Sequence, residues 1–221
     1  MRAIIFDLDG TLIDSVYAHV LSWQKSVAAK GMQVPAWSIH TKIGLSGKQL
    51  ALAIGRELGK PISEDEADGL DKRHGTIMKE LLPRPEPLPG AAALLRRLRE
   101  MNVPWGMATS GDRSGVEQAL RSLGLSGDVI AVCKSDVEHA KPEPDLFLAC
   151  RERLKVPARD CFVIGDAVWD MLAARRSGMQ GIGVLTGGIG RAELTEAGAY
   201  RVYGDPAELD ARRHELGLTR D

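Results

Sequence analysis

The feature that most constrains the fold lies at the start of the chain, in the sequence AIIFDLDGTLIDS. Ala3 to Phe6 form an uninterrupted apolar run, which is typical of a strand covered on both faces within a parallel sheet. Asp7 and Asp9 follow directly, and Gly10 then ends the strand. Two neighbouring carboxylates disfavour each other's ionised form unless a cation or a shared proton relieves them. The pair therefore predicts a functional site at the end of the first strand.

Strand and helix patterns alternate over the C-terminal part of the chain. Strand patterns cover 103–110, 128–133, 161–166, 181–185 and 199–203, and helix patterns cover 91–101, 113–124, 144–154 and 168–178. This alternation predicts a doubly wound parallel sheet, a Rossmann-like α/β fold. The first strand must join the same sheet, because a lone strand is not stable by itself.

The sequence between the first strand and this alternation has a different character. It carries helix patterns at 15–31, 47–59 and 63–82 and no strand pattern, and it ends in the proline-rich segment PRPEPLPG, which indicates a stiff linker or hinge. We therefore expect two domains. An α/β catalytic core is formed by residues 1–14 and 85–221, and an α-helical cap of residues 15–84 is inserted after the first strand.

Polar residues stand at the carboxyl ends of the predicted strands, where doubly wound sheets bind their ligands. In chain order they are Asp7 with Asp9, Thr109 with Ser110, Lys141, and Asp166 with Asp170. These residues should converge on one crevice. The helical insert leaves the sheet at the same edge, so we expect it to cover that crevice as a lid.

The converging residues suit phosphoryl transfer. Carboxylates are the ligands that Mg²⁺ prefers, and with the cation bound Asp7 can attack phosphorus. Asp9 can then protonate the leaving alcohol and later take a proton from water. The Thr109 hydroxyl, the amides of the following turn and the helix that starts near Arg113 can hold phosphate oxygens, and Lys141 adds a positive charge.

Taken in order, these residues resemble the haloacid dehalogenase (HAD) superfamily, and within it the phosphoglycolate phosphatase-like and β-phosphoglucomutase-like group with a small helical cap. Four segments are similar to the family's motifs: DLDGTLIDS at 7–15, MATSG at 107–111, AKPEPDLF at 140–147 and VIGDAVWDMLAARRSG at 163–178. The resemblance covers almost the whole chain. It implies a phosphatase that hydrolyses a small phosphomonoester, such as phosphoglycolate or a sugar phosphate, through an aspartyl-phosphate intermediate.

The resemblance also implies a role for each matching residue. Asp7 is the nucleophile and Asp9 the general acid/base. The Mg²⁺ ligands are the Asp7 side chain, the Asp9 backbone carbonyl and Asp166, with Asp170 in support. Thr109 and Lys141 bind the phosphate, and Gly10 and Ser110 belong to the same binding set. In the cap, His19 and Lys48 are candidate substrate contacts, and Lys42 is a further one.

Details of the motifs separate the chemistries within the family. Asp9 argues against a dehalogenase, which has no leaving alcohol to protonate. His19 stands ten residues after Asp9, as in the mutase-like members. However, the loop KIGLSGKQ at 42–49 lacks the arginine expected in a mutase cap, and Gly165 precedes Asp166 where a mutase would carry glutamate. A phosphatase is therefore favoured, and a phosphosugar mutase is the alternative.

Other interpretations compete with these assignments. Asp166 alone could be a helix N-cap, Asp170 could be a satisfied supporting residue, and His19, Lys42 and Lys48 could be ordinary packing or surface residues. A non-enzymatic phospho-acceptor, like a receiver domain, or a silent scaffold is a minor alternative for the whole chain.

The composition of the chain limits the classes of binding partner that we expect. The formal net charge of −1 and the pI near 6.5 provide no basic field for nucleic acid or an anionic membrane. Three cysteines without metal-site spacing indicate reduced thiols. No apolar stretch approaches membrane-spanning length, and the first strand starts at once, leaving no room for a signal peptide. We expect a cytoplasmic monomer or homodimer that acts on a small phosphorylated metabolite.

Overall fold

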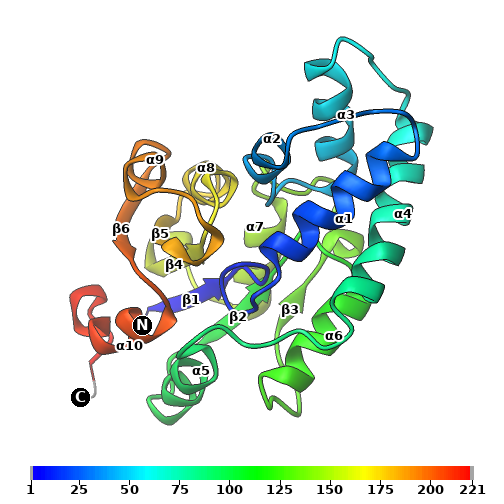
Figure 1. The fold of residues 1–221 in the computed structure, drawn as a ribbon. Helices are drawn as coiled ribbons and strands as arrows, with labels where there is room; N and C mark the ends of the chain where they lie inside the picture. The colour runs from blue at the N-terminus through cyan, green and yellow to red at the C-terminus, as the bar shows by residue number, and fades with distance from the viewer. Residues whose placement is uncertain (1, 220–221) are drawn as a thin grey trace. The chain divides into compact units, whose positions relative to one another are not determined.

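The structure is a computed structural model that describes residues 2–219 (Figure 1). The chain divides into two compact units, Met1–Asp14 with Pro85–Asp221 and Ser15–Arg84. These bounds coincide with those expected for the core and the cap, although Met1, Arg220 and Asp221 lie outside the described residues. That the first unit is catalytic and that the second closes over it stay predictions.

The first unit is built on a parallel sheet of six strands within the described residues, in the order β3-β2-β1-β4-β5-β6. The strands are β1 (Ala3–Phe6), β2 (Trp105–Ala108), β3 (Ala131–Val132), β4 (Cys161–Gly165), β5 (Gln180–Val184) and β6 (Ala199–Tyr203). The predicted doubly wound α/β fold is confirmed. The strand order reverses at β1, whose Phe6 is paired with Met107 of β2 on one side and Ile164 of β4 on the other.

Helices cover both faces of this sheet. The side chains of Ile4 and Phe6 share an apolar core with α5 (Ala91–Glu100), α6 (Arg113–Ser122) and α10 (Pro206–Ala211). Ala3 and Ile5 share the opposite core with α7 (Asp145–Leu154) and α8 (Val168–Arg176). Because successive residues of a strand point to opposite faces, a strand covered on both faces must be apolar throughout. This is the physical reason for the opening run of the sequence.

The second unit is a bundle of helices, and its described residues contain no strand. They are α1 (Val16–Ala28), α2 (Ala36–His40), α3 (Gly47–Glu57) and α4 (Glu64–Leu81). Val16, Val20, Trp23 and Val27, which recur at helical spacing along the predicted helix at 15–31, are buried in its core. Ser63 begins α4 with a capping box to Glu66.

The proline-rich segment differs from a simple hinge. The Asp14 amide donates to the Glu86 carbonyl and the Leu88 amide donates to the Leu12 carbonyl, both at 2.9 Å. Residues 12–14 and 86–88, both in the first unit, therefore run side by side as a hydrogen-bonded antiparallel pair. This pairing orders the backbone of the proline-rich segment where the sequence alone indicated only stiffness.

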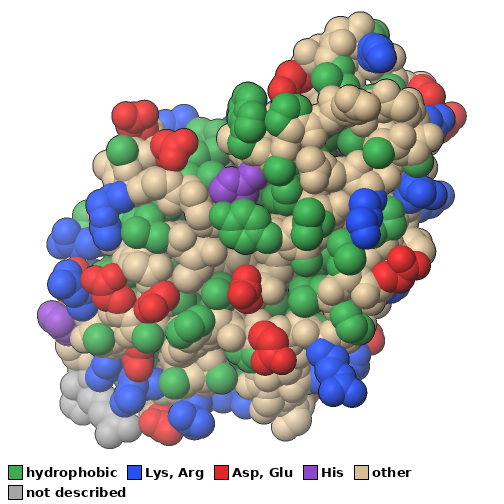
Figure 2. Space-filling model, viewed as in Figure 1, with side chains coloured by type: hydrophobic (Ala, Val, Ile, Leu, Met, Phe, Trp, Pro, Cys, Tyr) green, Lys and Arg blue, Asp and Glu red, His purple; other side chains and the backbone are tan. Residues whose placement is uncertain are grey.

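Figure 2 shows acidic and basic side chains interspersed over the visible face, which agrees with the nearly balanced charge of the sequence. Within the described part of the chain, no helix combines the length and the apolar character needed to cross a membrane. Cys133, Cys150 and Cys161 are buried free thiols, as expected.

Candidate active site

The site begins where the strand order of the sheet reverses. Asp7 follows β1 and Asp166 follows the neighbouring strand β4. The Asp7 amide donates to the Ile164 carbonyl at 2.8 Å, which continues the ladder to the last residue before the turn. In open α/β sheets the crevice beyond the carboxyl ends of two such strands is the usual ligand site. The predicted convergence of Asp7 and Asp166 is therefore present.

Three aspartates meet in this crevice. The carboxylate oxygens of Asp7, Asp166 and Asp170 lie within 4.8 Å of one another, and all three side chains are buried. Thr11 Oγ1 donates to Asp166 Oδ1 at 2.7 Å, and the Ala167 amide donates to Asp170 Oδ2 at 3.0 Å. The N-capping interpretation of Asp166 is wrong, because the N-cap position of α8 is Ala167 and Asp166 turns to Thr11 instead.

Lys141 brings the opposite charge into the same crevice. Its side chain is 1% exposed, and its Nζ lies 2.5 Å from Asp7 Oδ1 and 2.8 Å from Asp170 Oδ1. It comes from the loop before α7, outside any helix, because a residue that precedes a proline, here Pro142, is disfavoured in helical conformation. The Lys141 amine therefore bridges Asp7, which follows β1, and Asp170, which lies in the first turn of α8.

Burial dominates the electrostatics of the cluster. Desolvation raises the pKa of Asp7 to about 7; Lys141 opposes that shift, and the Asp170 and Asp9 carboxylates add to it. Desolvation likewise raises the pKa of Asp166 well above its usual range. For Lys141 burial alone would lower the pKa, but the carboxylates of Asp170 and Asp7 outweigh it and the pKa is raised.

The donor set fits a hard divalent cation. Among the described residues of the cluster, three carboxylates face a single ammonium group, which leaves an excess of negative charge in a buried place. Oxygen ligands of this kind suit Mg²⁺ and similar cations. The acidic triad can therefore bind a divalent metal ion, which would relieve the mutual repulsion of its carboxylates.

The end of β2 brings hydroxyl and amide groups close to Asp9. The Gly111 amide donates to Thr109 Oγ1 at 3.0 Å, and that hydroxyl keeps its own proton to donate. A Cβ placed on Gly111 would lie 3.2 Å from Thr109 Oγ1 and 3.8 Å from Asp9 Oδ2. The half-buried Ser110 belongs to the same turn. The N-terminus of α6 has fewer amides available to a phosphate than expected, because Asp112 Oδ1 accepts from the Gly115 amide at 2.8 Å.

Sequence reasoning missed the part of the site that follows β5. The Thr186 hydroxyl donates to the carbonyl of Gly10, whose φ of 77° lies in the left-handed region. A Cβ on Gly187 would lie 1.8 Å from Asp166 Oδ2, so only glycine lets this loop approach the carboxylate so closely. The signal was the glycine run TGGIG directly after a predicted strand. Thr11 was likewise overlooked inside the first motif.

The candidate residues of the second unit are paired within it. Lys48 Nζ lies 2.7 Å from Glu64 Oε2 and 3.4 Å from Asp68 Oδ2, and Lys42 Nζ lies 2.5 Å from Glu57 Oε2. His19 is also in this unit, and its Nδ1 lies 2.9 Å from Nε2 of a second histidine, His74. The sequence analysis did not single out His74.

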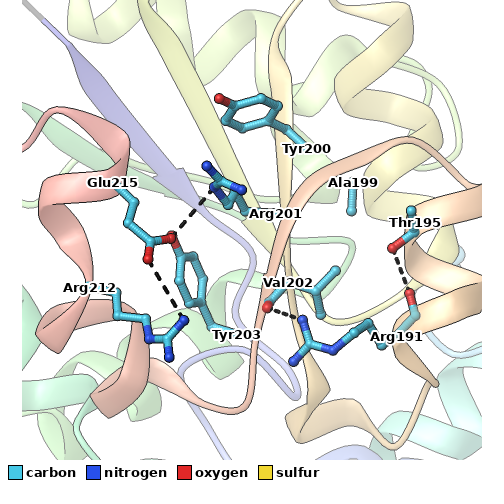
Figure 3. A pocket seen from close by; sticks show the side chains of 9 residues that line it. All are labelled: Arg191, Thr195, Ala199, Tyr200, Arg201, Val202, Tyr203, Arg212 and Glu215. Atoms are coloured by element: carbon cyan, nitrogen blue, oxygen red, sulfur yellow. Dashed lines mark hydrogen bonds and ion pairs between the residues drawn. The ribbon is translucent and has the colours of Figure 1, made fainter.

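A second group of charged residues lines a pocket elsewhere on the first unit (Figure 3). The pocket encloses about 350 Å³ and is lined by Arg191, Thr195, Ala199, Tyr200, Arg201, Val202, Tyr203, Arg212 and Glu215. In Figure 3, Arg201 and Arg212 point toward Glu215, and Arg191 reaches the carbonyl of Val202. We do not assign the active site to it, because Glu215 is the sole carboxylate among these lining residues.

Comparison with known proteins agrees with this geometry. The haloacid dehalogenase-like hydrolase family matches residues 1–178. Fructose-1-phosphate phosphatase YqaB of Escherichia coli (strain K12) is 32% identical over 82% of this chain and 95% of its own. Beta-phosphoglucomutase of Bacillus subtilis (strain 168) is 28% identical over 85% of this chain and 84% of its own.

A solved structure supports the same family assignment. The crystal structure of a hydrolase from Pseudomonas syringae superimposes with a TM-score of 0.94 at 41% identity, covering 98% of this chain and 99% of that one. The resemblance read from the four motifs is thereby confirmed. The chain belongs to the haloacid dehalogenase-like hydrolase family and is a phosphatase of that family.

Proposed function

We propose that the protein is a Mg²⁺-dependent phosphatase that hydrolyses a small sugar phosphate through an aspartyl-phosphate intermediate. The observation that carries this proposal is the buried cluster at the ends of β1 and β4, where Lys141 bridges Asp7 and Asp170 and three carboxylates lie within 4.8 Å. Such a cluster is costly to bury unless a bound cation or a charged substrate compensates it.

The metal ligands would be the side chains of Asp7 and Asp166 and the backbone carbonyl of Asp9, with Asp170 in support. When bound, Mg²⁺ supplies positive charge that keeps Asp7 ionised and that offsets the charge of the phosphate oxygens. The remaining steps belong to groups of the chain itself.

Asp7 is the nucleophile in this proposal. One of its oxygens attacks phosphorus while the bond from phosphorus to the leaving alcohol oxygen breaks, and Asp9 gives that oxygen its proton. In the second step Asp9 takes a proton from a water molecule. The water oxygen displaces Asp7 from phosphorus, inorganic phosphate leaves, and both aspartates return to their starting state.

Two further groups of the first unit bind the phosphate oxygens and stabilise their negative charge. Lys141 is buried, so its charge acts with little solvent screening on Asp7 and on phosphate oxygens beside it. The Thr109 hydroxyl and the amides of the turn after β2 can donate to the other oxygens. Thr109 is held at the end of β2 and by the Gly111 hydrogen bond, and Lys141 is held by Asp7 and Asp170, so both groups need little reorganisation during the reaction.

A sugar phosphate is the favoured substrate because both curated relatives described above carry names of hexose phosphate chemistry. Phosphoglycolate is the smaller alternative. The mutase alternative is supported by the beta-phosphoglucomutase relative and by His19. Against it, Gly165 precedes Asp166, and a Cβ at position 165 would lie 2.4 Å from Cβ of Asp170, so glutamate does not fit there as the loop stands.

The test is phosphate release from fructose 1-phosphate, β-glucose 1-phosphate, glucose 6-phosphate and phosphoglycolate, each with Mg²⁺ and with excess chelator. We expect release that requires the metal and that is fastest on a hexose phosphate. Interconversion of the two glucose phosphates without net release would replace the phosphatase by the mutase. Release that persists in chelator would overturn the metal-dependent reaction.

The nucleophile has a test of its own. Asp7→Asn keeps the shape of the side chain but removes the attacking oxygen, and we expect turnover to fall by at least about 1,000-fold with the fold intact. Asp128→Asn makes the same chemical change at an exposed position and should leave turnover unchanged. Ordinary turnover by Asp7→Asn would refute the assignment.

A further inference from the structure

The pocket on β6 holds an excess of positive charge that the proposed reaction does not use (Figure 3). Three guanidinium groups line it, those of Arg191, Arg201 and Arg212, and the sole carboxylate among its nine lining residues is that of Glu215. The lining side chains therefore carry two positive charges in excess. All of them belong to the first unit, so the pocket does not depend on where the second unit lies.

An irregularity in β6 turns two neighbouring side chains toward this pocket. Gly181 of β5 is paired with Ala199 and Ile182 with Arg201, so Tyr200 is an extra residue between the two pairs. Successive residues of a regular strand point to opposite faces, whereas a bulge re-aims a side chain. Tyr200 and Arg201 both line the pocket, and Cζ of Arg201 lies 5.2 Å from the centroid of the Tyr200 ring. The strand thus presents a guanidinium group and an aromatic ring together.

The contacts of the three arginines leave donors for a ligand. Each guanidinium group has five N–H donors. Arg191 donates one to a backbone carbonyl of β6, and Arg212 lies 3.4 Å from Glu208. The ion pairs of Arg201 and Arg212 with Glu215 are 3.6 and 3.7 Å long, which is beyond a direct hydrogen bond. Among the described residues these contacts engage a minority of the donors, so several N–H groups at the pocket can bind an anion.

We propose that this pocket binds the phosphate group of a small molecule, at a site separate from the active site. Guanidinium groups pair with phosphate through two parallel N–H···O bonds, and a phosphate dianion matches the two positive charges in excess. The volume of about 350 Å³ suits a small ligand.

The exposure of the arginines sets the strength of this binding. The side chains of Arg201 and Arg212 are 47% and 57% exposed, so a bound phosphate stays in contact with water. We therefore expect reversible binding with a Kd of about 1 mM that weakens as the salt concentration rises. The site binds an anion without reacting with it.

The first measurement is a titration of the wild-type protein with inorganic phosphate at constant ionic strength, followed by the ¹H–¹⁵N NMR signals of the backbone amides. We expect the amides of β6 and of the turn Arg213–Leu216 to shift and to saturate together. Phosphate at the active site would instead move the Gly111 amide and give a separate Kd. A failure of the β6 signals to saturate by about 20 mM phosphate would overturn the proposal, as would an equal shift with chloride.

Two variants with opposite expected effects distinguish a phosphate site from a purely structural group. Arg201→Gln removes one guanidinium group and should raise the Kd at β6 about tenfold. Glu215→Gln keeps the shape of the side chain but removes the competing negative charge, so the Kd should fall about two- to fivefold. Arg96→Gln removes the same charge from an exposed position of α5 and should leave the Kd unchanged. A higher Kd in both pocket variants would contradict the proposal, as would equal effects of Arg201→Gln and Arg96→Gln.

A pair of phosphonates identifies the kind of molecule that carries the phosphate group. Methylphosphonate and phenylphosphonate share the charged group, and neither has an ester bond for a phosphatase to hydrolyse. If phenylphosphonate binds about 2- to 10-fold more tightly and Tyr200→Ala removes that difference, the ligand carries an aromatic ring that stacks on Tyr200. Equal binding of the two assigns the site to free phosphate or to a phosphate ester without such a ring. If neither displaces phosphate from β6, the site does not recognise this group and the proposal fails.

Discussion

The first unit carries two clusters of charged residues that differ above all in the solvent around them. In the cluster at the ends of β1 and β4, Asp7, Asp166, Asp170 and Lys141 are all at most 4% exposed. In the pocket on β6, the side chains of Arg201 and Arg212 are 47% and 57% exposed. The buried cluster combines three carboxylates with one ammonium group, whereas the pocket on β6 combines three guanidinium groups with one carboxylate. The nearest charged atoms are 2.5–2.8 Å apart in the first cluster but 3.6–3.7 Å apart around Glu215.

The difference shows how burial turns charge into a site. In the buried cluster desolvation raises the pKa of Asp7 to about 7, and each charge depends on its neighbours. At the surface of β6 water can replace any partner, so exposed pairs of this kind contribute about 0–1 kcal/mol. A group of charges therefore indicates chemistry only when water cannot compensate it. The following predictions test that distinction.

The largest expected effect on stability comes from Lys141. Lys141→Met removes the ammonium group that bridges Asp7 and Asp170 and leaves their carboxylates buried without it. We expect the free energy of unfolding to fall by about 3–5 kcal/mol in chelator, measured by urea denaturation. Lys79→Met, on an exposed position of α4, is the control and should stay near wild type. A loss below about 1 kcal/mol would mean that water reaches the cluster and would break the comparison.

Metal binding should have the next largest effect. A cation held by Asp166 and its neighbours binds the folded state alone, so Mg²⁺ at about 100 times its Kd adds about 2.7 kcal/mol. We expect a rise in the thermal midpoint of roughly 5–10 °C for a chain of this size. Asp166→Asn should abolish most of that rise, whereas Arg201→Gln in the β6 pocket should keep it. Equal responses in the two variants would contradict a specific site at the triad.

The sequence predicted the elements whose pattern is set locally. The uninterrupted run from Ala3 to Phe6 indicates a strand covered on both faces, and the helical spacing of apolar residues from Val16 to Val27 indicates a helix covered on one face. The short helices α2, α9 (Arg191–Glu196) and α10 were missed, because five or six residues complete fewer than two turns and show no period. The strand expected at 128–133 shrinks to Ala131–Val132 because, at the edge of the sheet, it pairs with β2 alone.

The candidate site likewise contains residues that the sequence predicted and residues that it missed. The meeting of Asp7 with Asp166 follows from a general property of parallel sheets, so two strand ends sufficed to predict it. Thr11, Gly187 and His74 were missed because each acts on a partner that is far away in the sequence. His74 lies 55 residues from His19, and Thr11 lies 155 residues from Asp166. No local pattern records which loop or helix will face another.

The pH dependence of Tyr203 probes the β6 pocket from its buried side. Its hydroxyl donates to Glu215 Oε2 at 3.2 Å, and burial together with that carboxylate raises the pKa of Tyr203 to about 12. The folded state therefore holds the phenol proton more tightly than the unfolded state. The stability contribution is complete below about pH 10 and is lost as the pH rises toward 12, by up to about 3 kcal/mol.

Thermal unfolding across this pH range, compared between wild type and Tyr203→Phe, measures that loss. The wild-type protein should lose stability more steeply, because the variant has no phenol to ionise at this position. The ultraviolet absorbance of the phenolate gives an independent reading of the same titration. Parallel curves for the two proteins would show that Glu215 and burial do not perturb the tyrosine, and the pocket would then be solvated throughout.

The smallest expected effect belongs to Arg212, whose side chain lies 3.4 Å from Glu208 and 3.7 Å from Glu215. Arg212→Gln should change the free energy of unfolding by no more than about 0.5 kcal/mol, because exposed ion pairs are screened and water solvates the carboxylates left behind. Phosphatase turnover should also be unchanged. A loss above about 1 kcal/mol would show that Arg201, Arg212 and Glu215 act as an ordered network. Exposure would then not be what separates the two clusters, and the excess of negative charge at the triad would have to explain the site by itself.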